Sequence, residues 1–311
     1  MKKFICESVI ILKLPVLALS ILVYPKSVLS QNTILYSSPN PISQEQTSKD
    51  SSTDPKTNNV KEEWHKNGQL KSRVKLKNGL ASGKMRVWYE DGSPQLQLKY
   101  KNGLLHGKQK ELYRTGALKK KSKFISGKKE GKHIEWYKNG KKKSTLQYRS
   151  DLKDGIQIEW YRNGQLKSKG AWNKNKMEGL WLRWWDNGKK QGEVKLVNGR
   201  PDGDQIEWFE NGNLKKKGSY AKGGRDGTWI MWYTNGNKRG ETTLSNGRPD
   251  GLAKEWYSNG SLKNEGYFIE GARVGPWKYW TEEKELQKVE FYEKGRLRNT
   301  EYLLRKKRGV K

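Results

Sequence analysis

The chain is poor in the residues that carry most catalytic and metal chemistry. Its single cysteine, Cys6, lies near the N-terminus, and its only histidines are His65, His106 and His133. A mature form without the N-terminal segment would have no disulfide and no thiolate metal ligand. Walker loops, nucleophile elbows and HExxH motifs are also missing from the sequence. Because nearly every polar residue is one copy of a repeated series, no group stands apart as a nucleophile or base. We therefore expect a protein that is not an enzyme and needs no cofactor.

Apolar and acidic residues are scarce as well. Only 32% of the 311 residues are hydrophobic, whereas 31% are charged and 33 residues are glycine. This composition argues against a thick globular core and favours a thin array, in which each unit buries its apolar residues against its neighbours. Asp and Glu number 33 against 64 Lys and Arg, so the net charge is +31. Such a charge attracts nucleic acid, anionic lipid or acidic envelope polymers.

The longest apolar stretch, 14–23, lies near the N-terminus behind two lysines, and Val28 and Ser30 supply the small residues of a cleavage site. We interpret residues 1–30 as a secretory signal peptide, with an uncleaved anchor as the alternative. Export then places the protein outside the cell, in a periplasm or on a cell envelope. Residues 31–60 are rich in Ser, Thr, Asn, Pro and Gln, and are expected to form a disordered polar linker.

Aromatic residues recur at a fixed interval over the rest of the chain. A tryptophan stands at the same point of successive 24-residue units, with Leu112 replacing it once. This tryptophan column consists of Trp64, Trp88, Trp136, Trp160, Trp184, Trp208, Trp232, Trp256 and Trp280. Ten units without insertions cover residues 61–299, and we expect 300–311 to be a basic tail. The last copy departs from the pattern, so residues 277–304 are interpreted as a cap over the final strand edge.

Two glycines at fixed positions indicate two turns in each unit. The first turn carries Gly68, Gly92, Gly116, Gly140, Gly164, Gly188, Gly212, Gly236 and Gly260. Asn or Asp usually precedes these glycines, which suits a two-residue hairpin loop. The second glycine column, Gly83 to Gly275, belongs to a longer turn such as NGRPDG at 198–203. The segments between the turns are short and alternating, which is typical of strands. The sequence predicts an all-β fold, an elongated open antiparallel array of β-hairpins in 24-residue units.

The register of the first hairpin stays open at this stage. A two-residue loop at Asn163-Gly164 places Tyr161 opposite Leu166 and Trp160 opposite Lys167. A three-residue loop closed by a glycine bulge pairs Trp160 with Leu166 instead.

Alternate units differ from one another, because a 48-residue shift aligns 160–207 with 208–255. One strand position holds glycine in one set of units and a larger residue in the other. Its members are Gly170, Gly218 and Gly266 in the first set, and Leu146, Val194 and Thr242 in the second. The packing unit is therefore expected to be a pair of hairpins.

The unit W-Y-x-N-G-x-L-K, followed by an aromatic such as Tyr100 or Phe124 and then x-x-G-x-x-x-G, resembles the MORN repeat. It is most similar to the bacterial variant often labelled a YwqK-type antitoxin, and the resemblance covers about residues 61–299. It implies a MORN-like meander that serves as a scaffold, a membrane-associated platform or a protein-binding module.

A column of cations follows the first turn and is the candidate site for an anionic partner. It consists of Lys71, Lys119, Lys143, Lys167, Lys215, Arg239 and Lys263. Neighbouring copies of the unit lie about 10 Å apart, close to the screening length at physiological salt, so their charges act together. The alternative is a solvated face that deters edge pairing. A glutamate column stands before the aromatic residues, and we expect cross-strand Glu–Lys contacts of about 0.2–1 kcal/mol each. It comprises Glu63, Glu111, Glu135, Glu159, Glu207 and Glu255.

Two other columns are expected to have structural roles. The tryptophans are expected to be repeat packing, with a ladder of exposed rings that stacks on sugars or bases as the alternative. An acidic column precedes the second glycine and comprises His106, Glu130, Asp154, Glu178, Asp202, Asp226 and Asp250. A calcium site needs six or more converging oxygens. Single acids about 10 Å apart cannot supply them, so we expect ordinary turn chemistry and no metal site.

These observations predict a non-catalytic secreted or envelope-associated repeat scaffold. Its expected partner is an acidic protein, an anionic lipid or an envelope polymer. The alternatives are a nucleic-acid-binding protein, an antitoxin-like protein and a glycan-binding repeat protein.

Overall fold

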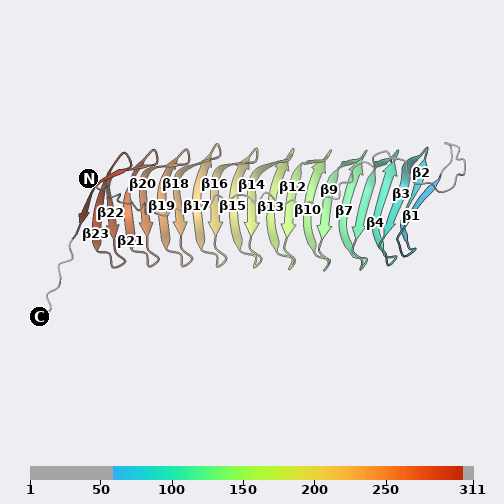
Figure 1. The fold of residues 1–311 in the computed structure, drawn as a ribbon, viewed down its shortest axis with the longest axis horizontal. Coiled ribbons are helices and arrows are strands. Elements are labelled where there is room, and N and C mark those ends of the chain that lie inside the picture. Colours follow the sequence, from blue (N-terminus) through green and yellow to red (C-terminus); the bar gives the residue numbers. More distant parts are fainter. Residues whose placement is uncertain (1–58, 304–311) are drawn as a thin grey trace, which may run out of the picture. The chain divides into compact units, whose positions relative to one another are not determined.

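The computed structural model describes residues 59–303. The expected signal peptide, nearly all of the expected linker and the end of the expected tail lie outside these residues. Within 59–303 every regular element is a strand, and the strands form one antiparallel sheet (Figure 1). No helix in this part of the chain is long and apolar enough to cross a bilayer. The all-β prediction is confirmed.

The strands have the following bounds: β1 (Val60–Trp64), β2 (Leu70–Lys77), β3 (Leu80–Trp88), β4 (Pro94–Lys101), β5 (Leu104–Leu105), β6 (Gly107–Leu112), β7 (Leu118–Ile125), β8 (Lys128–Lys129), β9 (Gly131–Trp136), β10 (Lys142–Arg149), β11 (Leu152–Lys153), β12 (Gly155–Trp160), β13 (Leu166–Asn173), β14 (Lys176–Trp184), β15 (Lys190–Val197), β16 (Arg200–Trp208), β17 (Leu214–Ala221), β18 (Gly224–Trp232), β19 (Lys238–Ser245), β20 (Arg248–Trp256), β21 (Leu262–Ile269), β22 (Ala272–Trp280), β23 (Leu286–Glu293) and β24 (Arg296–Tyr302).

Each strand pairs with the strands that precede and follow it in the chain. β13, for example, pairs with β12 on one side and β14 on the other. In three units the strand after the second turn is interrupted, so that β5 and β6, β8 and β9, and β11 and β12 are parts of one run that pairs with a single neighbouring strand. The result is a meander of hairpins in chain order, as the repeat predicts.

The first turn of each unit is a three-residue loop. The Tyr161 amide donates to the Gln165 carbonyl at 2.8 Å, and the Gly164 amide donates to the Tyr161 carbonyl at 2.9 Å. Gly164 has a φ of +95°, while Asn163 stays outside the left-handed region. A three-residue loop closed by one left-handed residue is a common hairpin connection. Trp160 therefore pairs with Leu166, so the two-residue loop is wrong and the other register is the correct one.

The second turn is the two-residue loop. Asn198 and Gly199 have φ values of +52° and +82°, and Val197 pairs directly with Arg200. Two successive positive φ angles are what a type I′ hairpin requires. Gly203 lies inside β16, with a φ of +102°, where the register with β15 shifts. The prediction of a longer second turn is wrong, because the second glycine column forms a strand bulge after a tight turn.

The end of the described chain continues the sheet. β23 pairs with β22, and β24 pairs with β23, in the same antiparallel pattern as the preceding units. Residues 286–302 thus add two strands to the edge of β22, and the interpretation of 277–304 as a cap stays a prediction. Lys284 takes the left-handed conformation of the missing first-turn glycine, with a φ of +67°, which keeps the hairpin intact.

The 48-residue alternation has a packing cause on one face of the sheet. The indoles of Trp181, Trp229 and Trp277 are buried against the glycines of the alternating position. Each indole also meets a second ring edge-on: Trp181 meets Trp172 with centroids 5.5 Å apart. Further toward the N-terminus the positions 48 and 96 residues before Trp181 hold His133 and Met85. Because only every second strand supplies a large ring, neighbouring hairpins are not equivalent.

Candidate functional site

The expected cation column lies on the strands that leave the first turns, and part of it is ion-paired. Lys119 Nζ lies 2.6 Å from Glu111 Oε1, and Lys143 Nζ lies 3.4 Å from Glu135 Oε2. A third pair joins Lys215 to Glu207 at 3.7 Å. These are the cross-strand contacts that the two columns predict. The hydrogen bond that Lys119 donates to the Glu111 carboxylate raises the pKa of Lys119, which keeps this ammonium charged.

Other members of the cation column lie over aromatic rings of the first turn. Lys167 Nζ is 5.8 Å from the centre of the Tyr161 ring, and Lys263 Nζ is 5.6 Å from that of Tyr257. Arg239 is placed in the same way over Tyr233, at 5.9 Å. Lys71 is exposed on β2. The rings beside these cations are therefore those of the tyrosine that follows each tryptophan, and the charged groups stay in contact with solvent.

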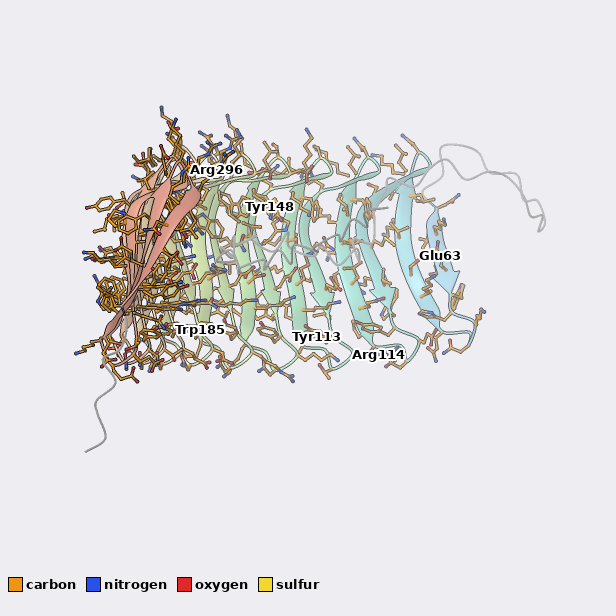
Figure 2. The ribbon with its side chains drawn as sticks, turned by 60° about the vertical axis from the view of Figure 1, so that its left-hand side comes forward. Glu63, Tyr113, Arg114, Tyr148, Trp185 and Arg296 are labelled. Atoms are coloured by element: carbon orange, nitrogen blue, oxygen red, sulfur yellow. The ribbon has the colours of Figure 1, made fainter. Side chains whose placement is uncertain are left out.

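The tryptophan column accepts hydrogen bonds between units at its backbone carbonyls. Its members are half-buried, except Trp64, which is 59% exposed. The hydroxyl of Tyr161 donates to the carbonyl of Trp184 in the next hairpin at 2.8 Å. The same bond joins Tyr89 to Leu112, Tyr113 to Trp136, Tyr137 to Trp160, Tyr233 to Trp256 and Tyr257 to Trp280. Figure 2 shows Tyr113 and Trp185 of this series along one edge of the sheet.

Sequence reasoning missed this hydroxyl ladder, although its signal is visible. In nearly every unit the residue after the tryptophan is an aromatic residue with a polar group at the end of its ring. This group is a hydroxyl, an indole N–H or an imidazole nitrogen. Trp185 Nε1 donates to the Trp208 carbonyl at 3.3 Å, and His65 Nε2 lies 3.0 Å from the Trp88 carbonyl oxygen. The shared property is a ring long enough to reach the next turn. These bonds use the backbone carbonyls of the tryptophan column, and the interpretation of its rings as repeat packing stays a prediction.

The expected acidic column performs turn chemistry. Glu178 accepts a hydrogen bond from the amide of Asn198 at 2.9 Å, and Glu130 accepts one from the amide of Ser150 at 3.0 Å. Each carboxylate thus holds the next tight turn in place. Within residues 59–303 no three His, Cys, Asp or Glu side chains come together in a way that could hold a metal ion.

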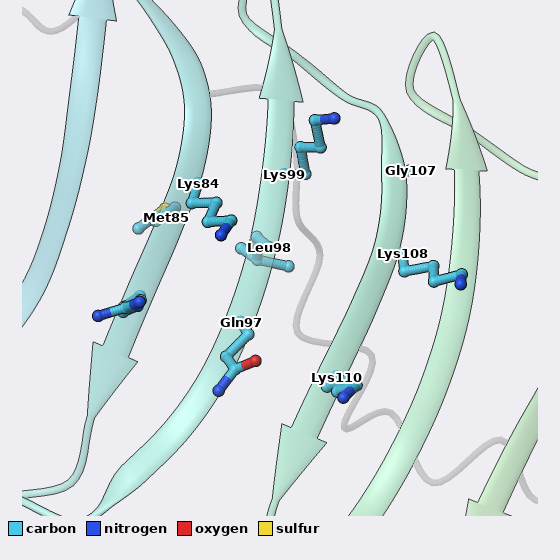
Figure 3. A pocket seen from close by; sticks show the side chains of 9 residues that line it. Lys84, Met85, Gln97, Leu98, Lys99, Gly107, Lys108 and Lys110 are labelled. Carbon is cyan, nitrogen blue, oxygen red and sulfur yellow. The ribbon is translucent and has the colours of Figure 1, made fainter.

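A pocket lies away from the cation column, on the sheet face over β3, β4 and β6 (Figure 3). It has a volume of about 440 Å³. Its polar lining consists of Lys84, Arg86, Gln97, Lys99, Lys108 and Lys110, and no acid among residues 59–303 lines it. Sequence reasoning missed this cluster because it searched columns at the repeat period. The signal that could have found it is the run of cations at every second residue, as in the KMR of β3 and the KQK of β6.

A smaller hollow of about 80 Å³ lies beside His133. The imidazole is 6% exposed, and its Nε2 has no hydrogen-bond partner among the described residues. It packs against Phe124 and Tyr148, at centroid distances of 5.9 Å and 4.6 Å. Burial, reinforced by the Lys129 ammonium, lowers the pKa of His133 to about 4. The side chain is therefore neutral near pH 7.

The comparison with known protein families agrees with this architecture. A family model described as MORN repeat variant matches residues 81–102, 129–150, 153–174, 177–198, 201–222, 225–246 and 249–270. None of the curated proteins compared with the chain matches it.

Among solved structures, the crystal structure of TcdB2-TccC3 matches at 10% identity and a TM-score of 0.18, over 76% of this chain and 17% of that chain. A TcdB2-TccC3-Cdc42 structure matches at 9% identity and a TM-score of 0.13, over 75% and 18%. The chain thus spans less than a fifth of those chains, and a likeness this weak carries no structural argument.

The last six matched segments follow one another at the 24-residue period, the first begins two periods before them, and the segments coincide with hairpins of the sheet. This chain belongs to the MORN repeat variant family.

Proposed function

We propose that the chain is a non-catalytic, exported scaffold that binds an anionic partner through many weak, repeated contacts. The observation that carries the proposal is the cation column, which recurs at one structural position along a sheet of regular hairpins. Equivalent cations in neighbouring units stand about 10 Å apart. At that distance their fields overlap at physiological salt. Single contacts of this kind are weak, so multiplicity supplies the affinity.

A salt titration of binding to vesicles tests the proposal. Vesicles that contain anionic phosphatidylserine should retain the full chain at low salt and release it as salt rises. Vesicles of neutral phosphatidylcholine are the matched control and should not retain it at any salt. Retention that does not change between low and high salt would contradict a charge-driven scaffold.

Export is a second part of the proposal, and the N-terminal residues 1–30 carry it. Expression of the full chain in a bacterial host, followed by fractionation and intact-mass measurement, tests this part. We expect the protein in the envelope or medium, shortened by the leader. A protein that stays in the cytosol with its leader intact would argue for the nucleic-acid alternative.

A further inference from the structure

One face of the sheet carries two parallel rows of cations over β3, β4, β6 and β7. The first row is Lys84, Lys99, Lys108 and Lys123, and the second is Arg86, Lys110 and Lys121 with the neutral Gln97 between the first two. Cross-strand register places them on one face, because Lys84 pairs with Lys99, Lys108 with Lys123 and Lys110 with Lys121. Gln97 joins the strands by pairing with both Arg86 and Lys110. Strand geometry sets about 4.8 Å between members of a row and about 7 Å between the rows.

These rows are unfavourable for the stability of the sheet. Like charges directly opposite one another on paired strands are destabilising, and three such lysine pairs occur here. The ion pairs of this region engage other lysines: Lys119 pairs with Glu111, and Lys120 with Glu135. None of the row cations forms an ion pair with a described carboxylate. The charge of the rows is therefore not neutralised within the part of the chain that the structure describes.

A later unit of the repeat has a complementary charge pair at the positions where the rows have two lysines. Six units further on, the positions equivalent to Lys110 and Lys121 are Lys254 and Glu265. These two residues are direct cross-strand partners, and their charged atoms lie 3.4 Å apart. The chain thus places a complementary pair at this position in one unit and two lysines in another. The rows are a local feature of the N-terminal units and not a requirement of the fold.

The pocket of about 440 Å³ lies between the two rows. Figure 3 shows Lys84, Lys99, Lys108 and Lys110 around it, from three neighbouring strands. A recess flanked by cations at regular intervals can hold a narrow chain of anionic groups. It is less suited to a ligand with a flat surface. Within the described part of the chain no aromatic side chain lines the recess, which therefore offers no stacking platform of the kind that binds single-stranded nucleic acid bases. Lysine is a common ligand for phosphate groups.

We infer that the paired cation rows are a binding track for a linear polymer of phosphate groups, which runs across strands β3 to β7. This inference rests on the proposed function, since it names a chemical class for the anionic partner and adds a second binding place to the cation column. The polymer's charges would lie between the rows and relieve the repulsion of the three lysine pairs.

Fluorescence anisotropy with labelled inorganic polyphosphate and the full chain tests the inference. One variant replaces Lys84, Lys99, Lys108 and Lys110 with Gln. The matched control replaces Lys169, Lys195, Lys217 and Lys278 with Gln, which removes the same charge from exposed positions of later units. We expect the track variant to bind at least tenfold more weakly and its salt slope to fall by about 3, at roughly 0.7 per lost contact. The control should stay within about twofold of the unchanged protein.

A second variant separates binding from folding. Lys121→Glu recreates the pair that Lys254 and Glu265 form, so it should raise the melting temperature while it weakens polyphosphate binding. Equal losses in the track variant and the control would overturn the track and leave the scaffold standing. A chain that binds anionic vesicles but not polyphosphate would overturn the phosphate polymer alone. A chain that binds neither would overturn the scaffold as well.

Discussion

The indole of Trp181 occupies the space that a side chain at position 170 would need. A β-carbon placed on Gly170 would lie 2.2 Å from Trp181 Cδ2, and the indole N–H donates to the carbonyl of Ala171 at 3.1 Å. The same arrangement recurs for Trp229 on Gly218 and for Trp277 on Gly266. A single-layer sheet can bury a tryptophan in this way because the ring lies against the backbone of the neighbouring strand at the glycine. The glycine is required by the ring and not by the backbone conformation.

Replacement of Gly170 by alanine should therefore destabilise the sheet. Forcing a methyl group into this space moves the ring or the strand, and overpacking of this kind costs about 1–3 kcal/mol. Gly192→Ala is the control, because its nearest neighbour would be 3.5 Å away and its φ is not positive. Urea unfolding followed by circular dichroism measures both. If the alanine at 170 were harmless, or if Gly170→Ala cost as much in a Trp181→Leu background, the packing explanation would be wrong.

The hydroxyl ladder predicts opposite effects for two aromatic substitutions. Tyr161→Phe removes the bond to the Trp184 carbonyl and should lower stability by about 1 kcal/mol. Phe209 occupies the same column without a hydroxyl. Phe209→Tyr should add the missing bond to the next turn and raise stability by about 0.5–1 kcal/mol. Thermal unfolding of the two variants checks this pair, and a change of the same sign in both would contradict it.

His133 should make the stability of the array sensitive to mild acid. Folding lowers its pKa from 6.5 to about 4, chiefly through burial and also through Lys129. The folded state therefore disfavours the proton, so stability is complete above about pH 6.5 and falls as the pH drops toward 4. The loss from this group is on the order of 3 kcal/mol. In the His133→Phe variant the denaturant midpoint should change little across this pH range. If the midpoint of the variant falls with pH as steeply as that of the unchanged protein, His133 is not the cause.

The left-handed residue of the tight second turn predicts stability changes of opposite sign for two substitutions. Lys222 has a φ of +54° before Gly223, at the position where Asn198 precedes Gly199 with a φ of +52°. Asparagine tolerates the left-handed region better than lysine. Lys222→Asn should stabilise by a few tenths to about 1 kcal/mol, and Asn198→Lys should destabilise by a similar amount. Melting temperatures measure both changes, and the idea fails if the two shifts are not opposite in sign.

The two turns show where sequence reasoning reached its limit. The Asn-Gly pair at 163–164 and the one at 198–199 are the same dipeptide, yet the first closes a three-residue loop and the second a two-residue loop. At the first turn the Asn163 side chain accepts a bond from the amide of Gln165 and donates to the carbonyl of Asp186 in the next hairpin. The three-residue loop also forms at 113–117, where Thr115 replaces the asparagine, so the Asn-Gly dipeptide by itself does not select the loop.

The sequence alone determined the repeat, the strands, the antiparallel hairpins and the excess of positive charge, because each of these depends on residue type and spacing along the chain. Tertiary structure decided the hairpin register, the burial of Trp181 on Gly170 and the alignment of lysines in two rows between strands. These features depend on which residues of adjacent strands stand opposite one another. A single bulge changes that pairing without any change in the periodic pattern.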